Sequence, residues 1–417
     1  MEIVRKLRDE DFRQFVEIAA NAYPHIGLNT AEDRLRFEER LIKIQNEDEK
    51  TNSYGLFRDG QLLGGMRFHD FRMKMHSVKV DAGGLALVAV DLAHKKEKVA
   101  KGIVSYFLKH YRERNTPIVV LYPFRPDFYK NMGFGFGTKM NQYSIRPQHF
   151  PKGGSKEHIA FYGDTDKQLM LDCYARIAEK TNGMMDREEY ELNNMLGIPQ
   201  NNTVVYKRGG RIEGYIVFMF KKMNEDNFLK HNIVVRELLY ENAEALMELM
   251  TFLNTQDDQI NRVIINTQDE YFHYLLSDPR NGTDRIFSPV CHESNIQGLG
   301  IMYRVINVRG LFEAMKGHNF NNQSCRLRLN IRDNFLEENN AGLIVHFENG
   351  NARIAEDNGY EAEISMDIAD FSSIVVGAVD FKALLKYGLA EISDVKYTPV
   401  VNELFRAEQK PICLTAF

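Results

Sequence analysis

One order of predicted elements occurs twice along this 417-residue chain, and this repeat constrains the fold more than any other feature of the sequence. Each copy consists of two helices, a β-hairpin, a strand, a helix and a final strand. Asp59-Gly60 marks the hairpin turn of the first copy, and Gly209-Gly210 takes its place in the second. The copies lie about 150 residues apart, which indicates two related α/β domains that arose by duplication. The alternative is a coincidence between common α/β elements.

Alternation and helical spacing of the apolar residues place the elements of both copies. In the first copy they are a strand at 2–7, helices at 10–23 and 31–46, hairpin strands at 54–57 and 61–68, strands at 75–80 and 85–90, a helix at 98–111 and a strand at 118–122. In the second they are helices at 167–180 and 187–196, hairpin strands at 203–206 and 211–220, a strand at 232–238, a helix at 243–254 and a strand at 262–266.

The last third of the chain differs, because short strands and turn signals follow one another closely. Its predicted elements are a strand at 304–308, a helix at 311–316, strands at 325–332, 342–348, 351–354 and 362–366, and a helix at 381–387. Asp278-Pro279 and Ser288-Pro289 interrupt regular structure before it. We therefore expect an α/β protein with mixed sheets in three domains, at residues 1–150, 151–290 and 291–417.

The composition disfavours several classes of protein. With 44% hydrophobic and 27% charged residues, the chain is typical of a globular protein. No apolar run approaches the ~20 residues of a membrane-spanning helix, and the start, MEIVRKLRDEDF, lacks the apolar stretch of a signal peptide. The cysteines form no C-x-x-C pair and the histidines no H-x-x-x-H pattern. We expect buried cysteines, no metal and a cytoplasmic protein.

Charge is distributed unevenly along the chain. Residues 1–150 carry 25 Lys and Arg against 19 Asp and Glu, whereas the remainder carries 28 against 39. A basic first third suits a ligand that bears phosphates. The acidic remainder favours a cationic substrate and disfavours nucleic acid. The alternative is scattered surface charge without a role in binding.

A short basic loop joins the strand at 85–90 to the following helix. Lys95, Lys96 and Lys98 lie in this loop, at the predicted helix start. The free N–H groups and the dipole of a helix N-terminus attract anions, and lysines reinforce that attraction for a pyrophosphate. Lys98 can contribute its N–H if its φ is negative, but a positive φ would favour glycine there. The alternative is an ordinary solvated helix start with Glu97 close by.

A second motif follows the strand at 118–122. Tyr129, Gly133 and Phe134 form a Y-x-x-x-G-F pattern at the end of a short predicted helix. A phenol of pKa ~10 can protonate a departing thiolate whose conjugate thiol has pKa ~8.5, or can simply pack before a glycine that ends the helix.

Together these motifs resemble the GNAT acetyltransferase superfamily. Its cofactor loop is R/Q-x-x-G-x-G/A; here Lys95 takes the first place, Lys98 the first glycine and Ala100 the final small residue. The order of pieces along the whole chain is similar to the Eis (enhanced intracellular survival) family. The quoted matches are Ala22-Tyr23-Pro24, residues 85–90 with the basic loop, residues 129–135, residues 304–308 and a chain that ends in Phe417.

The Eis resemblance implies two tandem GNAT-like domains followed by a sterol-carrier-protein-like domain, with acetyl-coenzyme A (acetyl-CoA) bound in the first. The residues it implies for acetyl-CoA are Leu87, Val88, Val90, Lys95, Lys96, Lys98, Ala100 and Phe124. In the second domain, residues 236–242 replace the basic loop and bring Glu237 and Glu241, so we expect no cofactor there.

The resemblance also implies the catalytic groups. Tyr129 would protonate the departing thiolate, and the α-carboxylate of Phe417 would activate the acceptor amine. Tyr23, His25 and Phe68 are candidates for the acceptor pocket, with core packing as the alternative. Members of the family assemble as hexamers, so a homo-oligomer is expected.

The predicted function is an acetyl-CoA-dependent N-acetyltransferase. The amine would attack the thioester directly, and the acceptor would be cationic: an aminoglycoside, a polyamine or a lysine side chain. One alternative is a non-catalytic acyl-CoA-binding protein with the same fold. The other is a lipid carrier that acts through the third domain.

Overall fold

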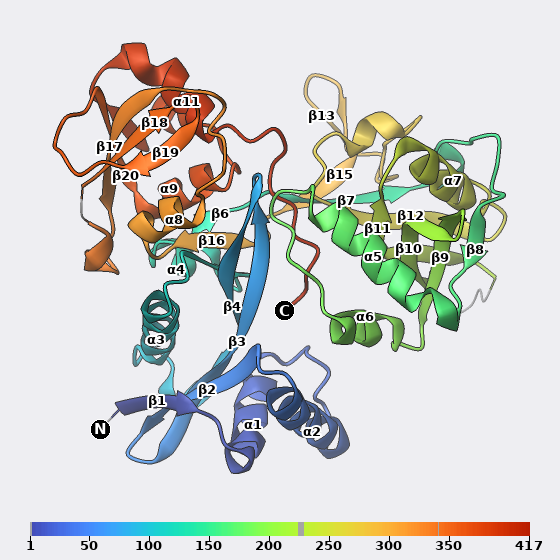
Figure 1. Cartoon of the computed structure of the whole chain (residues 1–417). Helices are drawn as coiled ribbons and strands as arrows, with labels where there is room; N and C mark the ends of the chain where they lie inside the picture. Colours follow the sequence, from blue (N-terminus) through green and yellow to red (C-terminus); the bar gives the residue numbers. More distant parts are fainter. Residues whose placement is uncertain (1, 224–228, 341) are drawn as a thin grey trace. The chain divides into compact units, whose positions relative to one another are not determined.

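The computed structural model describes residues 2–223, 229–340 and 342–417 (Figure 1). The chain forms two compact units. The first unit comprises Met1–Gly137, Ile301–Lys410 and Ala416–Phe417, and the second comprises Thr138–Gly300 and Pro411–Thr415.

A seven-stranded sheet with the order β1-β2-β3-β4-β5-β16-β6 organises the N-terminal part of the first unit. Its strands are β1 (Glu2–Lys6), β2 (Thr51–Arg58), β3 (Gln61–Met75), β4 (Val78–Val90), β5 (Ile118–Leu121), β6 (Gly135–Phe136) and β16 (Met302–Val305). The helices around it are α1 (Phe12–Ala22), α2 (Ala31–Glu47), α3 (Val99–Glu113) and α4 (Pro126–Lys130). Only β4 and β5 pair in parallel, because α3 returns the chain between them.

Two apolar clusters hold the helices against this sheet. Phe12, Phe15 and Val16 of α1 belong to one cluster, and Ile103 and Phe107 of α3 belong to the other. These residues recur every three to four positions, so each helix turns one apolar stripe to the strands. The helices predicted at 10–23, 31–46 and 98–111 form as α1, α2 and α3, and their bounds differ from the predicted ones by at most two residues.

The strands β4 and β5 diverge, and this divergence positions the site. They pair only between 82–85 and 118–121; β5 then ends, while β4 continues to Val90. At this point β4 also bulges, because Leu87 and Val88 stand opposite the single residue Met66 of β3. Leu87 has a left-handed φ of 48°. Backbone groups of β4 beyond residue 85 thus have no partner from β5.

A second sheet, with the order β19-β18-β17-β20-β21, completes the first unit. Its strands are β17 (Cys325–Arg332), β18 (Leu343–Glu348), β19 (Asn351–Ile354), β20 (Ala362–Asp367) and β21 (Ala390–Ile392). Its helices are α8 (Val308–Ala314), α9 (Ile368–Val375), α10 (Phe381–Lys386) and α11 (Thr398–Phe405). These elements correspond to the predicted third domain.

Helix α9 joins the two sheets of the first unit. Ser372 accepts a hydrogen bond from the N–H of Val305 in β16 at 2.9 Å. An ion pair makes a second link between the two sheets. Arg304 of β16, which is 0% exposed, donates to both carboxylate oxygens of Asp333, the residue after β17, at 3.0 and 3.1 Å. The strand predicted at 304–308 to open the third domain forms earlier, as β16 (Met302–Val305), and it joins the first sheet between β5 and β6. All four residues of β16 are buried, as in a strand that is covered on both faces.

The tight surroundings of Gly133 predict that a larger residue there destabilises the fold. Its φ is 83°, and a Cβ there would lie 1.4 Å from Nη1 of Arg304. Because Arg304 is fully buried beside Asp333, it has no space to retreat. Gly133→Ala is expected to lower the free energy of unfolding by about 3 kcal/mol, combining left-handed strain with a disturbed buried ion pair.

Gly60→Ala is the matched control for this prediction, because Gly60 has a φ of 87° and open space around its Cβ. We expect a loss of about 1 kcal/mol there, from strain alone. Denaturant unfolding of both variants measures the difference. Equal losses would contradict a steric role for Gly133.

The second unit contains a seven-stranded sheet with the order β15-β7-β12-β11-β10-β9-β8. Its strands are β7 (Met140–Ile145), β8 (Ile159–Phe161), β9 (Asn201–Arg208), β10 (Arg211–Lys222), β11 (His231–Tyr240), β12 (Ile260–Thr267) and β15 (Asn295–Gly298), beside a separate hairpin of β13 (Ile286–Phe287) and β14 (Cys291–His292). Its helices are α5 (Lys167–Ala178), α6 (Glu189–Leu196) and α7 (Ala243–Asn254).

This sheet repeats the arrangement of the first. β11 and β12 pair in parallel around α7, as β4 and β5 do around α3. The predicted fold class, tandem α/β domains followed by a third, is confirmed. The compact units change at Gly137 and Ile301, whereas the sequence placed boundaries near 150 and 290. β7 begins at Met140, before the expected boundary at 150, and already belongs to the sheet of the second unit. β16 begins at Met302, after the expected boundary at 290, and still belongs to the sheet of the first unit. Each strand joins its unit through pairing with strands that are distant in sequence.

No helix in the described ranges is both long and apolar enough to cross a membrane.

Candidate active site

A cavity of about 310 Å³ lies where β4 and β5 diverge in the first unit. The loop after α1, strand β4, the segment after β5, helix α4 and the chain end all contribute to its lining. The lining residues are Tyr23, Ile26, Leu85, Ala86, Leu87, Val88, Tyr122, Pro123, Phe124, Tyr129 and Phe417. Apolar and aromatic side chains therefore surround a stretch of strand backbone, as in pockets for small organic ligands.

Tyr129 lies on α4, which begins with Pro126 at its first position. The helix ends at once because Gly133 adopts a left-handed φ and the N–H of Phe134 returns to the carbonyl of Tyr129 at 3.1 Å. Tyr129 is 2% exposed, and the rings of Phe124 and Phe134 meet it edge-on. Burial raises the pKa of the phenol, so Tyr129 stays protonated and can donate a proton.

Tyr23 closes one side of the cavity. Its hydroxyl donates a hydrogen bond of 2.5 Å to the carbonyl of Val88, at the bulge of β4. Burial raises the pKa of Tyr23, so this donor is retained across the neutral range. The bond holds the loop after α1 against the strand, and a charge on Tyr23 would raise the pKa of Tyr129 further.

The end of the chain lies in the same cavity. The ring of Phe417 contacts those of Phe71 and Tyr122, with centroids 5.0 and 5.3 Å apart, and that of His69 at 5.8 Å. The aromatic contacts anchor the last residue, which is unlike the usual freedom of a terminus. The α-carboxylate therefore belongs to a residue that lines the cavity together with Tyr129.

The basic loop precedes α3 as predicted. Lys95, Lys96 and Lys98 are all exposed, and the first intrahelical bond runs from Gly102 N–H to the carbonyl of Lys98 at 2.9 Å. The first N–H groups of α3, including that of Ala100, have no acceptor within the helix and are available to an anion.

Of the two backbone conformations considered for Lys98, the structure has the one with a positive φ, which favours glycine. Lys98 is the N-cap of α3 with a φ of 65°, and Lys96 has a φ of 69°. The loop must turn sharply from the end of β4 into the helix, and this turn needs the conformation that glycine adopts most easily. A lysine there bears about 1–2 kcal/mol of strain.

The carboxylate of Glu97, next to the lysines of the loop, has a cationic partner in Arg58. Arg58 donates to its carboxylate at 2.5 Å, and the Nδ1 atom of His94 lies 3.2 Å away. The hydrogen bond from Arg58, followed by that from His94, lowers the pKa of Glu97. Its negative charge is therefore compensated by a neighbouring cation outside the loop.

Several predicted residues meet in the cavity and others do not. Tyr23, Leu87, Val88, Phe124, Tyr129 and Phe417 all line it. Phe68 instead stacks on Tyr54 in the core, with centroids 4.4 Å apart. His25 is exposed and Val90 ends β4, and neither is among the lining residues. The sequence reading missed Ile26, Leu85, Ala86, Tyr122 and Pro123. Tyr122 and Pro123 could have been found, because Tyr122 ends the predicted strand at 118–122 and Pro123 directly follows it.

In the second unit, strand β11 carries a buried polar network. Glu237, at the bulge of β11, accepts bonds from Arg187 at 2.6 and 2.7 Å and from the Tyr215 hydroxyl at 2.7 Å. Residues 411–415 pack beside this network: Ile412 donates to the carbonyl of Asn182 at 2.7 Å.

Family comparisons define the class of the protein. The acetyltransferase (GNAT) domain model matches residues 3–137, and a second acetyltransferase (GNAT) domain model matches residues 183–305. The sterol carrier protein domain matches residues 308–414. The chain therefore belongs to the GNAT acetyltransferases, and it is a transferase. Its domain order confirms the predicted Eis-like arrangement, with two GNAT domains before a sterol carrier protein domain.

Solved structures share this fold over 100% of both chains. A GCN5-related N-acetyltransferase from Anabaena variabilis is 17% identical with a TM-score of 0.83. A probable N-acyltransferase from Enterococcus faecalis is 18% identical, with a TM-score of 0.80. Eis1 from Mycobacterium abscessus is 18% identical, with a TM-score of 0.77. A comparison with curated proteins finds no match.

Proposed function

We propose that the protein is an acetyl-CoA-dependent N-acetyltransferase in which a cationic amine attacks the thioester directly. The observation that carries this proposal is the meeting of three groups in one cavity: the Tyr129 phenol, the terminal residue Phe417 and the backbone of β4 that β5 leaves unpaired. Such a cavity offers a proton donor, a carboxylate and N–H donors around one reacting carbonyl.

Acetyl-CoA would extend along β4 and onto α3. Backbone groups of Leu87, Val88 and Val90 would bind the pantetheine arm as an additional strand would, and Phe124 would cover it. Lys95, Lys96 and Lys98 would neutralise the phosphates at the start of α3, where the N–H of Ala100 is free of an intrahelical acceptor. The second unit is proposed to bind no acetyl-CoA.

The chemistry follows from the roles of these groups. The carboxylate of Phe417 takes one proton from the bound ammonium; the resulting neutral amine attacks the thioester carbonyl, forms the new C–N bond and loses its second proton to solvent. Backbone N–H groups of the β4 bulge stabilise the oxyanion. When the C–S bond breaks, the Tyr129 phenol gives its proton to the sulfur, and solvent restores it. The products are the amide and coenzyme A.

The acceptor class is proposed from charge. The cavity side chains include no lysine or arginine, and the Phe417 carboxylate would attract an ammonium group. An aminoglycoside, a polyamine and a lysine side chain share that group. We place the protein in the cytoplasm as a homo-oligomer, a hexamer by resemblance, without a nucleic-acid or membrane partner.

The test is release of coenzyme A thiol over a panel of amines, together with calorimetric binding of acetyl-CoA. Binding with turnover on a cationic amine supports the proposal. Binding without turnover on any amine indicates the acyl-CoA-binding alternative, and no binding at high micromolar concentration excludes both. A lipid carrier would instead bind fatty-acid probes in the third domain.

Two substitutions at Lys98 distinguish the contribution of the loop's backbone conformation to acetyl-CoA binding from the contribution of its charge. Lys98→Gly removes the charge but adopts the left-handed φ of 65° freely, so we expect the Kd of acetyl-CoA to rise by about threefold at most. Lys98→Val removes the same charge but resists that conformation, so we expect at least a tenfold rise. Calorimetry compares the two variants, and equal effects would mean that charge alone matters.

A further inference from the structure

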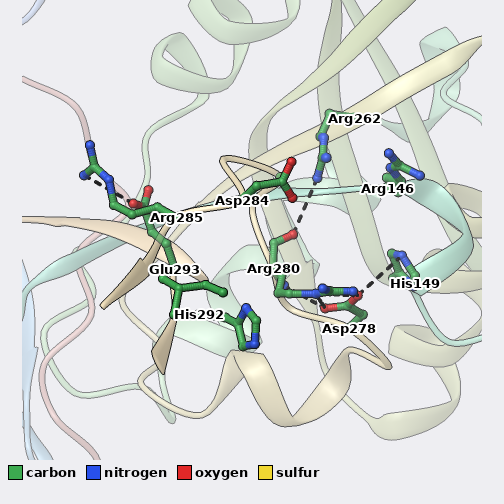
Figure 2. A pocket seen from close by; sticks show the side chains of 11 residues that line it. Arg146, His149, Arg262, Asp278, Arg280, Asp284, Arg285, His292 and Glu293 are labelled. Atoms are coloured by element: carbon green, nitrogen blue, oxygen red, sulfur yellow. Dashed lines mark hydrogen bonds and ion pairs between the residues drawn. The ribbon is translucent and has the colours of Figure 1, made fainter. Parts of the chain in front are cut away.

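A second cavity, of about 300 Å³, lies within the second unit and is rich in arginine (Figure 2). Its lining residues are Arg146, His149, Arg262, Asp278, Arg280, Gly282, Asp284, Arg285, Ile286, His292 and Glu293. None of them lines the proposed acetyl-CoA cavity. The lining therefore holds four arginines and three carboxylates, and its distribution of charge decides what it can bind.

Two of the three carboxylates already have arginine partners. Asp278 pairs with Arg280 at 2.6 Å, and this contact, drawn dashed in Figure 2, holds the pKa of Asp278 at about 2. Glu293 lies 3.4 Å from Arg285 and accepts a bond from the side chain of Asn281 at 2.6 Å. Asp284 is the lining carboxylate without such a pair, and Arg262 lies within the electrostatic influence of both Asp278 and Asp284.

Arg146 and Arg262 are neighbours across two antiparallel strands. Ile145 of β7 stands opposite Val263 of β12, the last pair of this register; Arg146 directly follows Ile145 and Arg262 directly precedes Val263, so the two arginines lie beside one another just past that pair. Like charges at opposite positions destabilise a sheet. Burial and then the charge of Arg146 lower the pKa of Arg262, and they outweigh the opposite effect of Asp278 and Asp284.

Neutral groups hold Arg262 in place without cancelling its charge. Its Nη1 atom donates to the carbonyl of Ser144 at 2.9 Å and approaches that of Arg280 at 3.5 Å. The loop passes directly over the guanidinium at Gly282, where a Cβ would lie 1.8 Å from Nη2. Arg262 is thus fixed in one position, which lowers the entropic cost of binding an anion.

We propose that this cavity binds a phosphomonoester through Arg146 and Arg262. Two adjacent guanidinium groups match the oxygens of a dianionic phosphate, and the ligand relieves their mutual repulsion. The volume of about 300 Å³ lies at the lower end of ligand pockets, with room for a small group that bears the phosphate. His149 and His292 add hydrogen-bonding groups to the wall.

The experiment is calorimetric titration of the full chain at constant ionic strength with ribose 5-phosphate, inorganic phosphate and ribose. We expect ribose 5-phosphate to bind at least fivefold more tightly than inorganic phosphate, and ribose not to bind. Equal affinity for the two phosphates would overturn the monoester in favour of the free ion. No binding of either at millimolar concentration would overturn the site.

Arg146→Gln tests the residues. Arg146 is exposed, so its loss leaves the core intact, and we expect affinity for ribose 5-phosphate to fall at least tenfold. Arg236→Gln is the control, because Arg236 is an exposed arginine of β11 outside the lining; we expect less than a twofold change. Equal losses of affinity in both variants would mean that the ligand responds to the overall charge of the protein and not to Arg146, and would overturn the proposal. Acetyl transfer is not part of this readout, so the outcome is independent of the proposed activity.

Discussion

Tyr129→Phe is expected to lower kcat at least 100-fold while the Kd of acetyl-CoA changes less than threefold. The substitution removes only the hydroxyl of a side chain that is 2% exposed, so the packing against Phe124 and Phe134 remains. A positioned general acid contributes about 10²–10⁴ in rate. Thiol release measures kcat, and calorimetry measures cofactor binding.

The leaving group provides a sharper readout for Tyr129. With an acetyl thioester of an acidic aromatic thiol, the departing thiolate needs no proton, so the deficit of Tyr129→Phe should shrink to less than tenfold. Tyr106→Phe, on α3 outside the cavity lining, is the control and should leave kcat within twofold. An undiminished deficit with the acidic thiol would assign Tyr129 a packing role instead.

The pH profile supplies a further check on Tyr129. Burial raises the pKa of its phenol above the usual value near 10, so the acid form persists throughout the neutral and mildly alkaline range. We expect no loss of kcat from phenol ionisation below about pH 10. An alkaline limb below that value which disappears in Tyr129→Phe would show that the phenol ionises more easily than its burial implies.

Extending the chain by one glycine beyond Phe417 is expected to lower kcat/KM at least 100-fold at neutral pH. The extension keeps the aromatic ring that contacts Phe71 and Tyr122, but it replaces the α-carboxylate by a neutral amide and moves the new carboxylate by about 3.5 Å. The acceptor ammonium then loses both its counter-ion and its proton acceptor. The measurement is thiol release with a saturating acetyl donor.

Two controls distinguish the loss of the terminal carboxylate from a disturbed packing of the last residue in the cavity. Phe417→Leu keeps the carboxylate and loses aromatic contacts, so we expect no more than a tenfold loss. The extended chain should recover activity as pH rises from 7 to 9, because solvent then deprotonates the amine. Unchanged turnover in the extended chain would remove the terminal carboxylate from the mechanism.

Local sequence signals predicted most of the elements and part of the cavity. Hydrophobic spacing placed α1 and α3, and the glycine of the Y-x-x-x-G-F pattern placed the end of α4, because these features depend on neighbours within a few residues. Phe68 and His25 were harder to place. An aromatic residue on a strand suits a core and a pocket equally, and Phe68 lies in the core.

The sequence by itself determined the repeated order of α/β elements, the presence of a third domain, and the position of the lysine-rich loop before α3. The tertiary structure alone decided that β16 pairs with β5, that Phe417 joins Tyr129 in one cavity, and that Arg146 and Arg262 line another. The reason is physical: helices and turns are specified by contacts between residues close in the chain, whereas these pairings join residues more than one hundred positions apart. Periodicity carries no information about which of several compatible strands or cavities such a distant segment will meet.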